Sequence, residues 1–537
     1  MPPFSAEFLS SPRGAGIVSI AARCLVFGCA AAISAAAVEP APVATVTGGQ
    51  VRGRLLPDGR SAVFKGLPFA QPPVGKLRWR EPRPVVPWDG VRDARESGPP
   101  AAQPRQGWND AFAAASREDC LYLDVWTPNW QSKPAQPVML WIHGGANVAG
   151  AGGADPLYDG SALINRGVVL VVIEYRLGIF GFFGHPELTR ESPHHASGNY
   201  GILDQIAALQ WVHDNIAQFG GDQGNVTIFG QSAGSIDVLA LMASPLSKGL
   251  FHRAIGESGA LGFDLASATI AQVERAGLLV AEKLKAPSND TLRYLRSCST
   301  GELLTADREA GAGSGPNTDG WVLPAPPVGI FATGREQRVP LIIGGNAIEL
   351  PAEGSPDDLK TMVRVIFGEL APQALALYGL ASDGDRGGAD PVYGGPADQL
   401  GSDLFRCPAM IQGEWHSTAG NPTWEYQFDR AIPPRPRTGH SSDLPYVFGN
   451  LYSKGSQAGE FQDADRSLSA TIQSYWTNFA KTGDPNGPGL PAWPKYDGKT
   501  RKYLEFTGTA TVVVNENQRG PFGDLFREIL NRPGSAR

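Results

Sequence analysis

The chain has 537 residues, of which 42% are hydrophobic, and it carries a formal net charge of -7 at pH 7. Its length allows several small domains or one large α/β unit, and either arrangement can bury a large core. The negative charge and the lack of a Lys/Arg cluster at helical spacing argue against nucleic-acid binding, and no Cys/His cluster has the spacing of a zinc site. We therefore expect small-molecule partners.

The N-terminal segment has the pattern of a secretory leader. Basic residues precede an apolar run from Cys24 to Ala37, and this run ends in the small residues SAAA. The run is too short and too rich in alanine for a membrane span, and no later segment reaches transmembrane length. The pattern predicts a signal peptide over residues 1–37, cut near Ala37, and a secreted or periplasmic protein. Lipid attachment through Cys29 is the alternative, which the bulky Phe27 disfavours.

Three cysteines follow this leader, namely Cys120, Cys298 and Cys407. Secreted proteins often carry disulfides. At most one bridge can form here, and the sequence leaves open whether Cys298 and Cys407 pair.

Beyond the leader, a hairpin pattern is followed by alternating strands and helices. TVTGGQVRGRLL, residues 45–56, predicts a small N-terminal hairpin, and a Pro-rich loop region continues as far as Pro100. Later runs rich in Val, Ile, Leu and aromatic residues are mostly unbroken, as expected of strands buried on both faces. These runs are LYLDVWTP, PVMLWIHGG, VVLVVIEY, NVTIFGQ, VPLIIGGN and PTWEYQF.

The clearest helix pattern is GNYGILDQIAALQWVHDNIAQFGG, residues 198–221. Apolar residues recur there at helical spacing and Gly220 ends the run. Helices between strands predict a mainly parallel sheet wrapped by helices. Because we find no repeat and no long polar linker, we expect one domain over residues 38–537. Residues 265–338 are interpreted as a helical, loop-rich excursion that helps cover a pocket.

One serine stands between two glycines at the end of a predicted strand. NVTIF predicts the strand, GQSAG a turn and SIDVLALMA a helix, which is the context of a nucleophile elbow. In such an elbow the residues two before and two after the serine must be small, and here they are Gly230 and Gly234. The N-terminal N–H groups of the helix favour negative charge at Ser232. A structural serine in a tight turn is the alternative, because G-x-S-x-G arises by chance in long chains.

A serine nucleophile needs a base, an orienting acid and donors for an oxyanion. HGG, residues 143–145, follows the strand PVMLWI, and glycine there lets successive N–H groups turn toward one point. We predict Gly145 and Ala146 as oxyanion donors, with Ala233 as the third. An ordinary glycine-rich strand end is the alternative.

The chain resembles the type-B carboxylesterase family, the relatives of cholinesterases and of bacterial para-nitrobenzyl esterases. The resemblance implies an α/β-hydrolase fold, with a large central, mostly parallel sheet flanked by helices. It also implies hydrolysis of carboxylic esters through an acyl-enzyme. The matching stretches follow the family's order from Val46 to Tyr496 and include FKGLPFAQPPVGKLRWREP, EDCLYLDVWTP, WIHGGA, EYRLGIFGF, FGQSAGS, FHRAIGESG, GHSSDLPYVFG and NFAKTGDPNGPGLPAWPKYD.

The resemblance further implies a catalytic triad in the chain order serine, acid, histidine. Ser232 is the nucleophile, and the implied acid is Glu349, just after the strand VPLIIGGN, where active sites of such sheets lie. The implied base is His440, in the loop segment RTGHSSDLPYVFG. His416, on an apparent helix, is interpreted as a packing or surface residue, and His143 as support for the oxyanion loop. No metal or organic cofactor is required.

Two positions next to the reacting centre depart from the family's pattern. Gln231 stands where the family commonly has glutamate, and Asn147 where an aromatic residue often follows the HGG turn. We interpret both as substrate-binding residues, because they disfavour a cationic, choline-like substrate and suit a polar or anionic acyl group. Some secreted bacterial members of the family act on tricarballylate esters of fumonisin-type toxins, and such esters would suit a pocket of this kind. Neutral drift at both positions is the alternative.

The disulfide that usually closes an N-terminal loop in this family lacks one partner here. Cys120 stands at one of its positions, and the other position is Ala101. We therefore expect a free thiol and an untied loop over residues 98–119. Cys407 also stands at a family cysteine position without a recognisable partner, and we expect its thiol to be free.

Two other functions are compatible with this fold. Catalytically silent adhesion or binding modules share it, but such proteins usually lack a member of the triad. A lipase is the second alternative, although the sequence shows no clear amphipathic lid. We expect no obligatory protein partner.

Overall fold

The computed structural model describes residues 41–130, 133–260, 268–312, 314–382, 389–452 and 459–530. These residues belong to one compact unit, Ala41–Arg537. The predicted signal peptide, residues 1–37, lies outside the described residues and stays a prediction. Within the described ranges, no helix combines the length and the apolar character that a membrane crossing needs.

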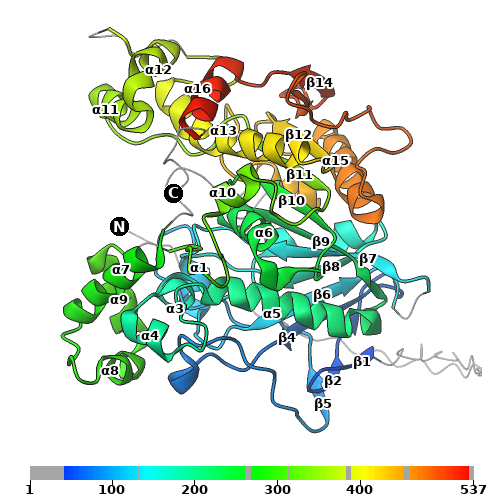
Figure 1. The fold of residues 1–537 in the computed structure, drawn as a ribbon. Helices are drawn as coiled ribbons and strands as arrows, with labels where there is room; N and C mark the ends of the chain where they lie inside the picture. Colours follow the sequence, from blue (N-terminus) through cyan, green and yellow to red (C-terminus); the bar gives the residue numbers. More distant parts are fainter. Residues whose placement is uncertain are drawn as a thin grey trace, which may run out of the picture. The chain divides into compact units, whose positions relative to one another are not determined.

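Two sheets organise the chain (Figure 1). The smaller has the strand order β1-β2-β5, and the larger has 11 strands in the order β14-β13-β12-β11-β10-β9-β7-β8-β6-β4-β3. The strands are β1 Val43–Val46, β2 Gly49–Arg52, β3 Arg54–Leu55, β4 Ala62–Pro68, β5 Val91–Asp93, β6 Tyr122–Thr127, β7 Gln136–Ile142, β8 Val169–Ile173, β9 Gly221–Gln231, β10 Arg253–Glu257, β11 Leu341–Asn346, β12 Thr423–Phe428, β13 Lys502–Phe506 and β14 Val512–Glu516.

Parallel pairing prevails in the centre of the large sheet. The strands from β8 through β7, β9, β10, β11 and β12 to β13 pair in parallel. Antiparallel pairs occur toward the edges, where β8, β6, β4 and β3 follow one another and where β14 meets β13. The predicted mostly parallel sheet is confirmed, and so is the N-terminal hairpin, because β1 and β2 pair antiparallel.

Helices flank the large sheet, and two groups of them stand out in Figure 1. One group, coloured green, contains α7, α8 and α9, and another, coloured yellow-green to red, contains α11, α12, α13 and α16. The helices are α1 Asp110–Ala115, α2 Ser161–Ile164, α3 Gly178–Phe182, α4 Pro186–Glu191, α5 Tyr200–Asn215, α6 Ala233–Ala243, α7 Ile270–Lys283, α8 Thr291–Ser297, α9 Thr300–Ala310, α10 Pro327–Ala332, α11 Pro356–Phe367, α12 Ala371–Leu377, α13 Pro396–Thr418, α14 Leu444–Phe448, α15 Asp463–Thr482 and α16 Gly520–Leu530.

Successive residues of the central strands face two different hydrophobic cores. On β7, Leu140 belongs to a core that also contains Leu209 of α5 and Leu239 of α6. The next residue, Trp141, belongs to a second core that contains Trp476 of α15. Because each strand places alternate side chains on opposite faces, a sheet covered on both sides needs unbroken apolar runs. This is why the strands read as continuous hydrophobic stretches.

The predicted helix of residues 198–221 and the predicted excursion are both present. Helix α5 is followed by a short 3-10 turn that ends at Gly220, whose φ of 76° lies in the left-handed region that favours glycine. Between β10 and β11 the chain leaves the sheet and forms α7, α8, α9 and α10. The carboxyl ends of β7, β9 and β11 lead directly into the residues described next.

Candidate active site

Ser232 lies in a strained turn between β9 and α6. Its φ of 58° and ψ of -125° are rare for a residue with a side chain, and its N–H donates to the carbonyl of Glu257 at 2.8 Å. The neighbouring glycines are required by close contacts. A Cβ on Gly230 would lie 2.6 Å from the carbonyl oxygen of Gly234, and one on Gly234 would lie 2.1 Å from that of Ile142. The strand-turn-helix context predicted for Ser232 is therefore present, with the geometry of a nucleophile elbow.

The turn after β7, residues 143–147, is called the oxyanion turn here after its predicted role, and it lies directly beside this elbow. A Cβ on Gly144 would lie 3.0 Å from Cβ of Ser232, so the two turns are in van der Waals contact. Gly145 has a φ of 108°, and a Cβ there would lie 1.9 Å from the carbonyl oxygen of Ala149, which excludes any other residue. Ala146 follows with a φ of 57°. The turn is thus tightly wound and close to the serine.

Three N–H groups in this region are available for an oxyanion. Among the described residues, the N–H groups of Gly145 and Ala146 donate to no other backbone oxygen. Ala233 is the first residue of α6, and the first N–H groups of a helix have no intrahelical acceptor. These are the three predicted donors. Their convergence on one oxyanion position stays a prediction.

Glu349 and His440 are brought together from distant parts of the chain. Glu349 follows β11, His440 precedes α14, and Nδ1 of His440 lies 2.6 Å from Oε2 of Glu349. The other carboxylate oxygen, Oε1, accepts a hydrogen bond of 2.7 Å from the N–H of Asn346. The Glu349 side chain is 1% exposed and that of His440 is 14% exposed, so the imidazole is the member of this pair that reaches the surface.

Nε2 of His440 contacts Gln231 rather than the serine. The side-chain amide nitrogen of Gln231 lies 3.2 Å from Nε2. Among the described residues, no hydrogen bond joins Oγ of Ser232 to His440. Catalytic hydrogen bonds are often long in substrate-free structures and shorten when substrate binds. The ring of Phe405 packs against His440 with 5.3 Å between ring centroids, a neighbour that the sequence did not reveal.

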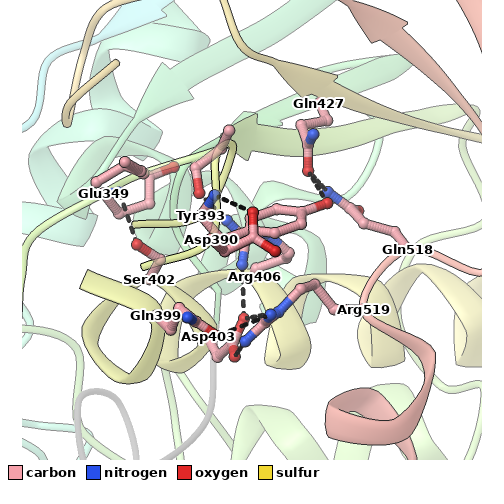
Figure 2. A network of polar contacts seen from close by, with 12 residues as sticks. Glu349, Asp390, Tyr393, Gln399, Ser402, Asp403, Arg406, Gln427, Gln518 and Arg519 are labelled. Atoms are coloured by element: carbon pink, nitrogen blue, oxygen red, sulfur yellow. Dashed lines mark hydrogen bonds and ion pairs between the residues drawn. The ribbon is translucent and has the colours of Figure 1, made fainter. Parts of the chain in front are cut away.

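A network on α13 holds the loop that carries Glu349 (Figure 2). The N–H of Glu349 donates to Oγ of Ser402 at 2.9 Å. One turn further along the same helix, Arg406 donates to the carbonyl oxygens of Asn346 and Ala347. These contacts fix the backbone on the N-terminal side of Glu349.

Two further charged residues complete this network. The Asp403 carboxylate accepts a hydrogen bond of 2.6 Å from Arg406 and one of 2.5 Å from Arg519. The ring of Tyr393 contacts both guanidinium groups, at 4.9 Å from Arg406 and 4.8 Å from Arg519. The segment just before α16 is thereby connected to the acid of the candidate triad.

Buried carboxyl groups lie behind Glu349. The Asp443 carboxylate accepts hydrogen bonds from Tyr426 at 2.9 Å and from Asn346 at 3.2 Å. Burial, together with the nearby charge of Glu349, raises the pKa of Asp443 to about 6. Burial raises the pKa of Glu257 well above its usual value, and Asp443 adds to that effect. Both shifts favour the neutral forms of Asp443 and Glu257, which limits the negative charge close to Glu349.

The two remaining histidines of interest are buried and held by the protein. Burial lowers the pKa of His143 to about 4, its Nδ1 lies 2.8 Å from the carbonyl of Gly144, and its ring packs on Tyr175. His416 on α13 is buried between Oε1 of Glu336, at 2.7 Å, and the carbonyl of Val339, at 2.8 Å. His416 is thus a packing residue rather than a surface one.

The side chain of Asn147 is held by the protein at both ends. Its Nδ2 donates to Oδ1 of Asp237 at 3.0 Å, and its Oδ1 accepts from the hydroxyl of Tyr175 at 3.0 Å. Its backbone φ of 56° lies in the left-handed region, which asparagine tolerates better than most residues. The structure therefore places the amide away from free solvent, and its assignment to substrate stays a prediction without support from these contacts.

As expected, no disulfide closes the loop over residues 98–119, and hydrogen bonds hold the loop instead. Cys120 is a free, buried thiol, as are Cys298 and Cys407. The amide of buried Gln103 accepts from the N–H of Gly150 at 2.9 Å and donates to its carbonyl at 2.7 Å. The predicted free thiols at Cys120 and Cys407 are confirmed. The loop is tied by Gln103 to the segment that follows the oxyanion turn, a role that spacing alone could not reveal.

Comparison with known proteins gives the context for this geometry. The sequence model of the family described as "Carboxylesterase family" matches residues 40–353 and 375–521 of this chain. The chain belongs to the carboxylesterase family. It is 36% identical over 512 residues to "Fumonisin B1 esterase" of Sphingopyxis macrogoltabida, a match that covers 91% of this chain and 90% of that protein. It is 37% identical over 509 residues to "Liver carboxylesterase" of Sus scrofa, covering 85% and 88% of the two chains.

Solved structures of the carboxylesterase family agree with the fold. A PNB esterase structure superposes with a TM-score of 0.79 at 32% identity and covers 90% of this carboxylesterase and 99% of its own chain. The carboxylesterase of Geobacillus stearothermophilus superposes with a TM-score of 0.77 at 30% identity, covering 90% and 99%. The α/β-hydrolase fold and the enzymatic class predicted from the sequence are confirmed, and this carboxylesterase is an ester hydrolase.

Proposed function

We propose that the enzyme hydrolyses carboxylic esters through an acyl-enzyme formed on Ser232, with His440 as general base and Glu349 as the orienting acid. The observation that carries this proposal is the 2.6 Å contact between Nδ1 of His440 and Oε2 of Glu349, beside the strained turn of Ser232. A carboxylate at Nδ1 fixes the tautomer whose Nε2 is free to accept a proton.

The reaction follows from these positions. His440 takes the proton from Oγ of Ser232, and the oxygen attacks the ester carbonyl. The tetrahedral oxyanion accepts hydrogen bonds from the N–H groups of Gly145, Ala146 and Ala233. Protonated His440 then gives its proton to the leaving alcohol. In the second half of the reaction, His440 takes a proton from water, which attacks the acyl-enzyme. His440 then returns the proton to Oγ of Ser232, and the carboxylic acid leaves.

A cavity beside the oxyanion turn gives room for part of the ester. It has a volume of about 190 Å³, and its wall includes Phe182, Val273 and Ser314. Oγ of Ser314 donates to the carbonyl of Ala146 at 3.0 Å, which joins the cavity wall to the turn. Burial raises the pKa of Asp307, another wall residue, to about 7. This shift favours the neutral form of Asp307, and the rest of the wall is largely apolar, so we assign the hydrocarbon part of the alcohol to this cavity.

For the acyl group we propose a polar or polycarboxylate acid of the tricarballylate type. Two facts support this choice. The relative from Sphingopyxis macrogoltabida is named a fumonisin B1 esterase. The residue before the nucleophile is uncharged Gln231, so no carboxylate at that position repels an anionic acyl group.

The experiment is kcat/KM on a matched panel of esters that share one alcohol, with neutral short, neutral long, cationic and carboxylated acyl groups. We expect the carboxylated esters to be favoured by about tenfold, or about 1.4 kcal/mol of differential transition-state binding. Equal rates for carboxylated and neutral esters of the same size would remove the substrate half of the proposal. Strong activation by long-chain emulsions would instead favour a lipase.

A further inference from the structure

A chain of buried polar groups joins the helix that follows Ser232 to the oxyanion turn. Asp237, on α6, accepts hydrogen bonds from Nε2 of Gln205 at 2.6 Å and from Nδ2 of Asn147 at 3.0 Å. Oδ1 of Asn147 lies 3.0 Å from the hydroxyl of Tyr175, which lies 2.7 Å from the carbonyl oxygen of His143. The chain thus begins on the nucleophile's helix and ends at the first residue of the turn.

Asp237 has an environment that favours a neutral acid. It is the only ionisable side chain of α6 and is completely buried. Burial raises the pKa of Asp237 to about 7, and the hydrogen bonds from Asn147 and Gln205 oppose that effect only in part. The titratable group next in this hydrogen-bond chain is Tyr175, which is close to Glu174 and packs on His143. Asp204, the sequence neighbour of Gln205 on α5, is paired with Arg176 at 2.7 Å.

Counting hydrogens in this chain also favours protonated Asp237. The Tyr175 hydroxyl has one proton but faces two acceptors, the His143 carbonyl and Oδ1 of Asn147. If Asp237 carries a proton, the Asn147 amide can turn over. Oδ1 of Asn147 then accepts from Asp237, its Nδ2 donates to the Tyr175 oxygen, and Tyr175 donates to His143. Every contact in the chain then has one donor and one acceptor.

We propose that Asp237 is a positioning residue for ester hydrolysis and acts as a neutral carboxylic acid. Through Asn147, Asp237 fixes the N–H donors of Gly145 and Ala146 relative to Ser232. The inference rests on the proposed function. The oxyanion turn needs such support, because Ala146 and Asn147 both have left-handed backbone angles that cost energy. Asn147 is then a link between the turn and α6 rather than a contact for substrate.

The first test compares two substitutions at Asp237. Asp237→Ala interrupts the chain of hydrogen bonds and leaves the N–H donors of the oxyanion misplaced. We expect kcat to fall by about ten- to a hundredfold and KM to change by less than about threefold, because these donors stabilise the transition state more than the bound substrate. Asp237→Asn keeps the shape and the neutral hydrogen bonds, and we expect kcat at pH 7 within about threefold of the parent. Affinity for a trifluoromethyl ketone, which forms an oxyanion on the serine, should fall in parallel with kcat/KM for Asp237→Ala.

The second test is the pH dependence of kcat between pH 6 and pH 9. The parent should lose activity on the alkaline side as Asp237 ionises, whereas Asp237→Asn should not show that loss. If Asp237 had a purely structural role, its substitution would change the fraction of folded enzyme but would not remove the alkaline limb of the pH profile of kcat. Identical profiles for the parent and Asp237→Asn would overturn the neutral-acid part of the inference.

A matched control removes buried hydrogen bonds elsewhere. Asn450 is buried and its Nδ2 donates to the carbonyls of Leu157 and Asp159, so Asn450→Ala loses a comparable pair of bonds. We expect it to lower Tm without lowering kcat of the folded enzyme. If Asp237→Ala does not fold, Asn147→Ala and Tyr175→Phe break the same chain and carry the same expectation.

The outcomes separate this inference from the proposed function. A Ser232→Ala enzyme that kept its activity would contradict the proposed function. An inactive Ser232→Ala together with a folded Asp237→Ala whose kcat is within twofold of the parent would contradict the positioning role alone. A double variant Asn147→Ala/Asp237→Ala should be no slower than the slower single variant, because both break one chain.

Discussion

The side-chain amide nitrogen of Gln231 lies 3.2 Å from Nε2 of His440, the imidazole nitrogen that faces away from Glu349. With the Gln231 amide in this orientation, its nitrogen donates and Nε2 accepts. The proton of the neutral imidazole is then on Nδ1, directed at Glu349, which is the tautomer that a general base needs. The proposed reaction requires the hydroxyl of Ser232 to replace Gln231 at Nε2 when substrate binds.

Changing Gln231 to glutamate should move the pH profile of the enzyme. A carboxylate at this distance stabilises the imidazolium, so the acid limb of kcat/KM for Gln231→Glu should shift to higher pH by about one unit. The uncharged Gln231→Met is the control and should leave the acid limb in place. An unchanged limb in Gln231→Glu would mean that the side chain at this position does not face His440 in the working enzyme.

The backbone of the oxyanion turn should tolerate no side chain at Gly145. A Cβ there would lie 1.9 Å from the carbonyl oxygen of Ala149, so Gly145→Ala must displace the turn. Loss of one donor costs about two to three orders of magnitude, and we expect kcat to fall by at least that much. Gly107 also has a left-handed φ, of 84°, but nothing lies within 4 Å of its Cβ position. Gly107→Ala should therefore cost some stability and leave kcat unchanged, and a similar kcat loss in both variants would argue against a specific role of the turn.

The three described cysteines should react as buried free thiols. Burial raises the pKa of the Cys120 and Cys407 thiols well above their usual value, and the pKa of Cys298 is raised to a lesser degree. Thiolate is the reactive form, so labelling of the native enzyme should be slow at all three. After unfolding without reductant, peptide mapping should find all three labelled. A Cys298–Cys407 disulfide peptide would contradict this expectation.

Asp237 should make the enzyme less stable as pH rises. Its pKa in the folded enzyme is about 7, above the 3.9 or so of an unfolded aspartate. Between these values the folded chain keeps a proton that the unfolded chain has lost, so raising the pH through this window favours unfolding. Asp237→Asn does not titrate. Between pH 5 and pH 8 the unfolding free energy of the parent should therefore fall by about 2 to 3 kcal/mol relative to that of Asp237→Asn. Parallel stability curves for the two proteins would contradict the assignment.

Much of the fold was predictable because its main determinants are local. Buried central strands such as β7 and β8 are unbroken apolar runs, and α5 has a clear helical period. The strands β4, β5, β10, β13 and β14 were not predicted. Lys65 and Gly66 interrupt the apolar pattern of β4, and β10 is a five-residue strand with Arg253 and Glu257 at its ends.

The candidate site was predictable only as far as its motifs reach. Ser232, Glu349 and His440 were named from motif and family order, and the structure places the last two in contact. The partners of Asn147 could not be named, because Asp237 comes 90 residues later in the chain and is a single acidic residue in a mostly apolar helix. A buried polar pair separated by that distance has no signal in a single sequence.

The most direct measurement is active-site labelling of the enzyme with an organophosphate, followed by peptide mapping and assay of Ser232→Ala. We predict one label per chain, on Ser232, with loss of esterase activity in proportion to labelling, and an inactive Ser232→Ala that takes up no label. A label on another residue, or a Ser232→Ala enzyme that keeps most of the activity, would contradict the proposed role of Ser232 as nucleophile.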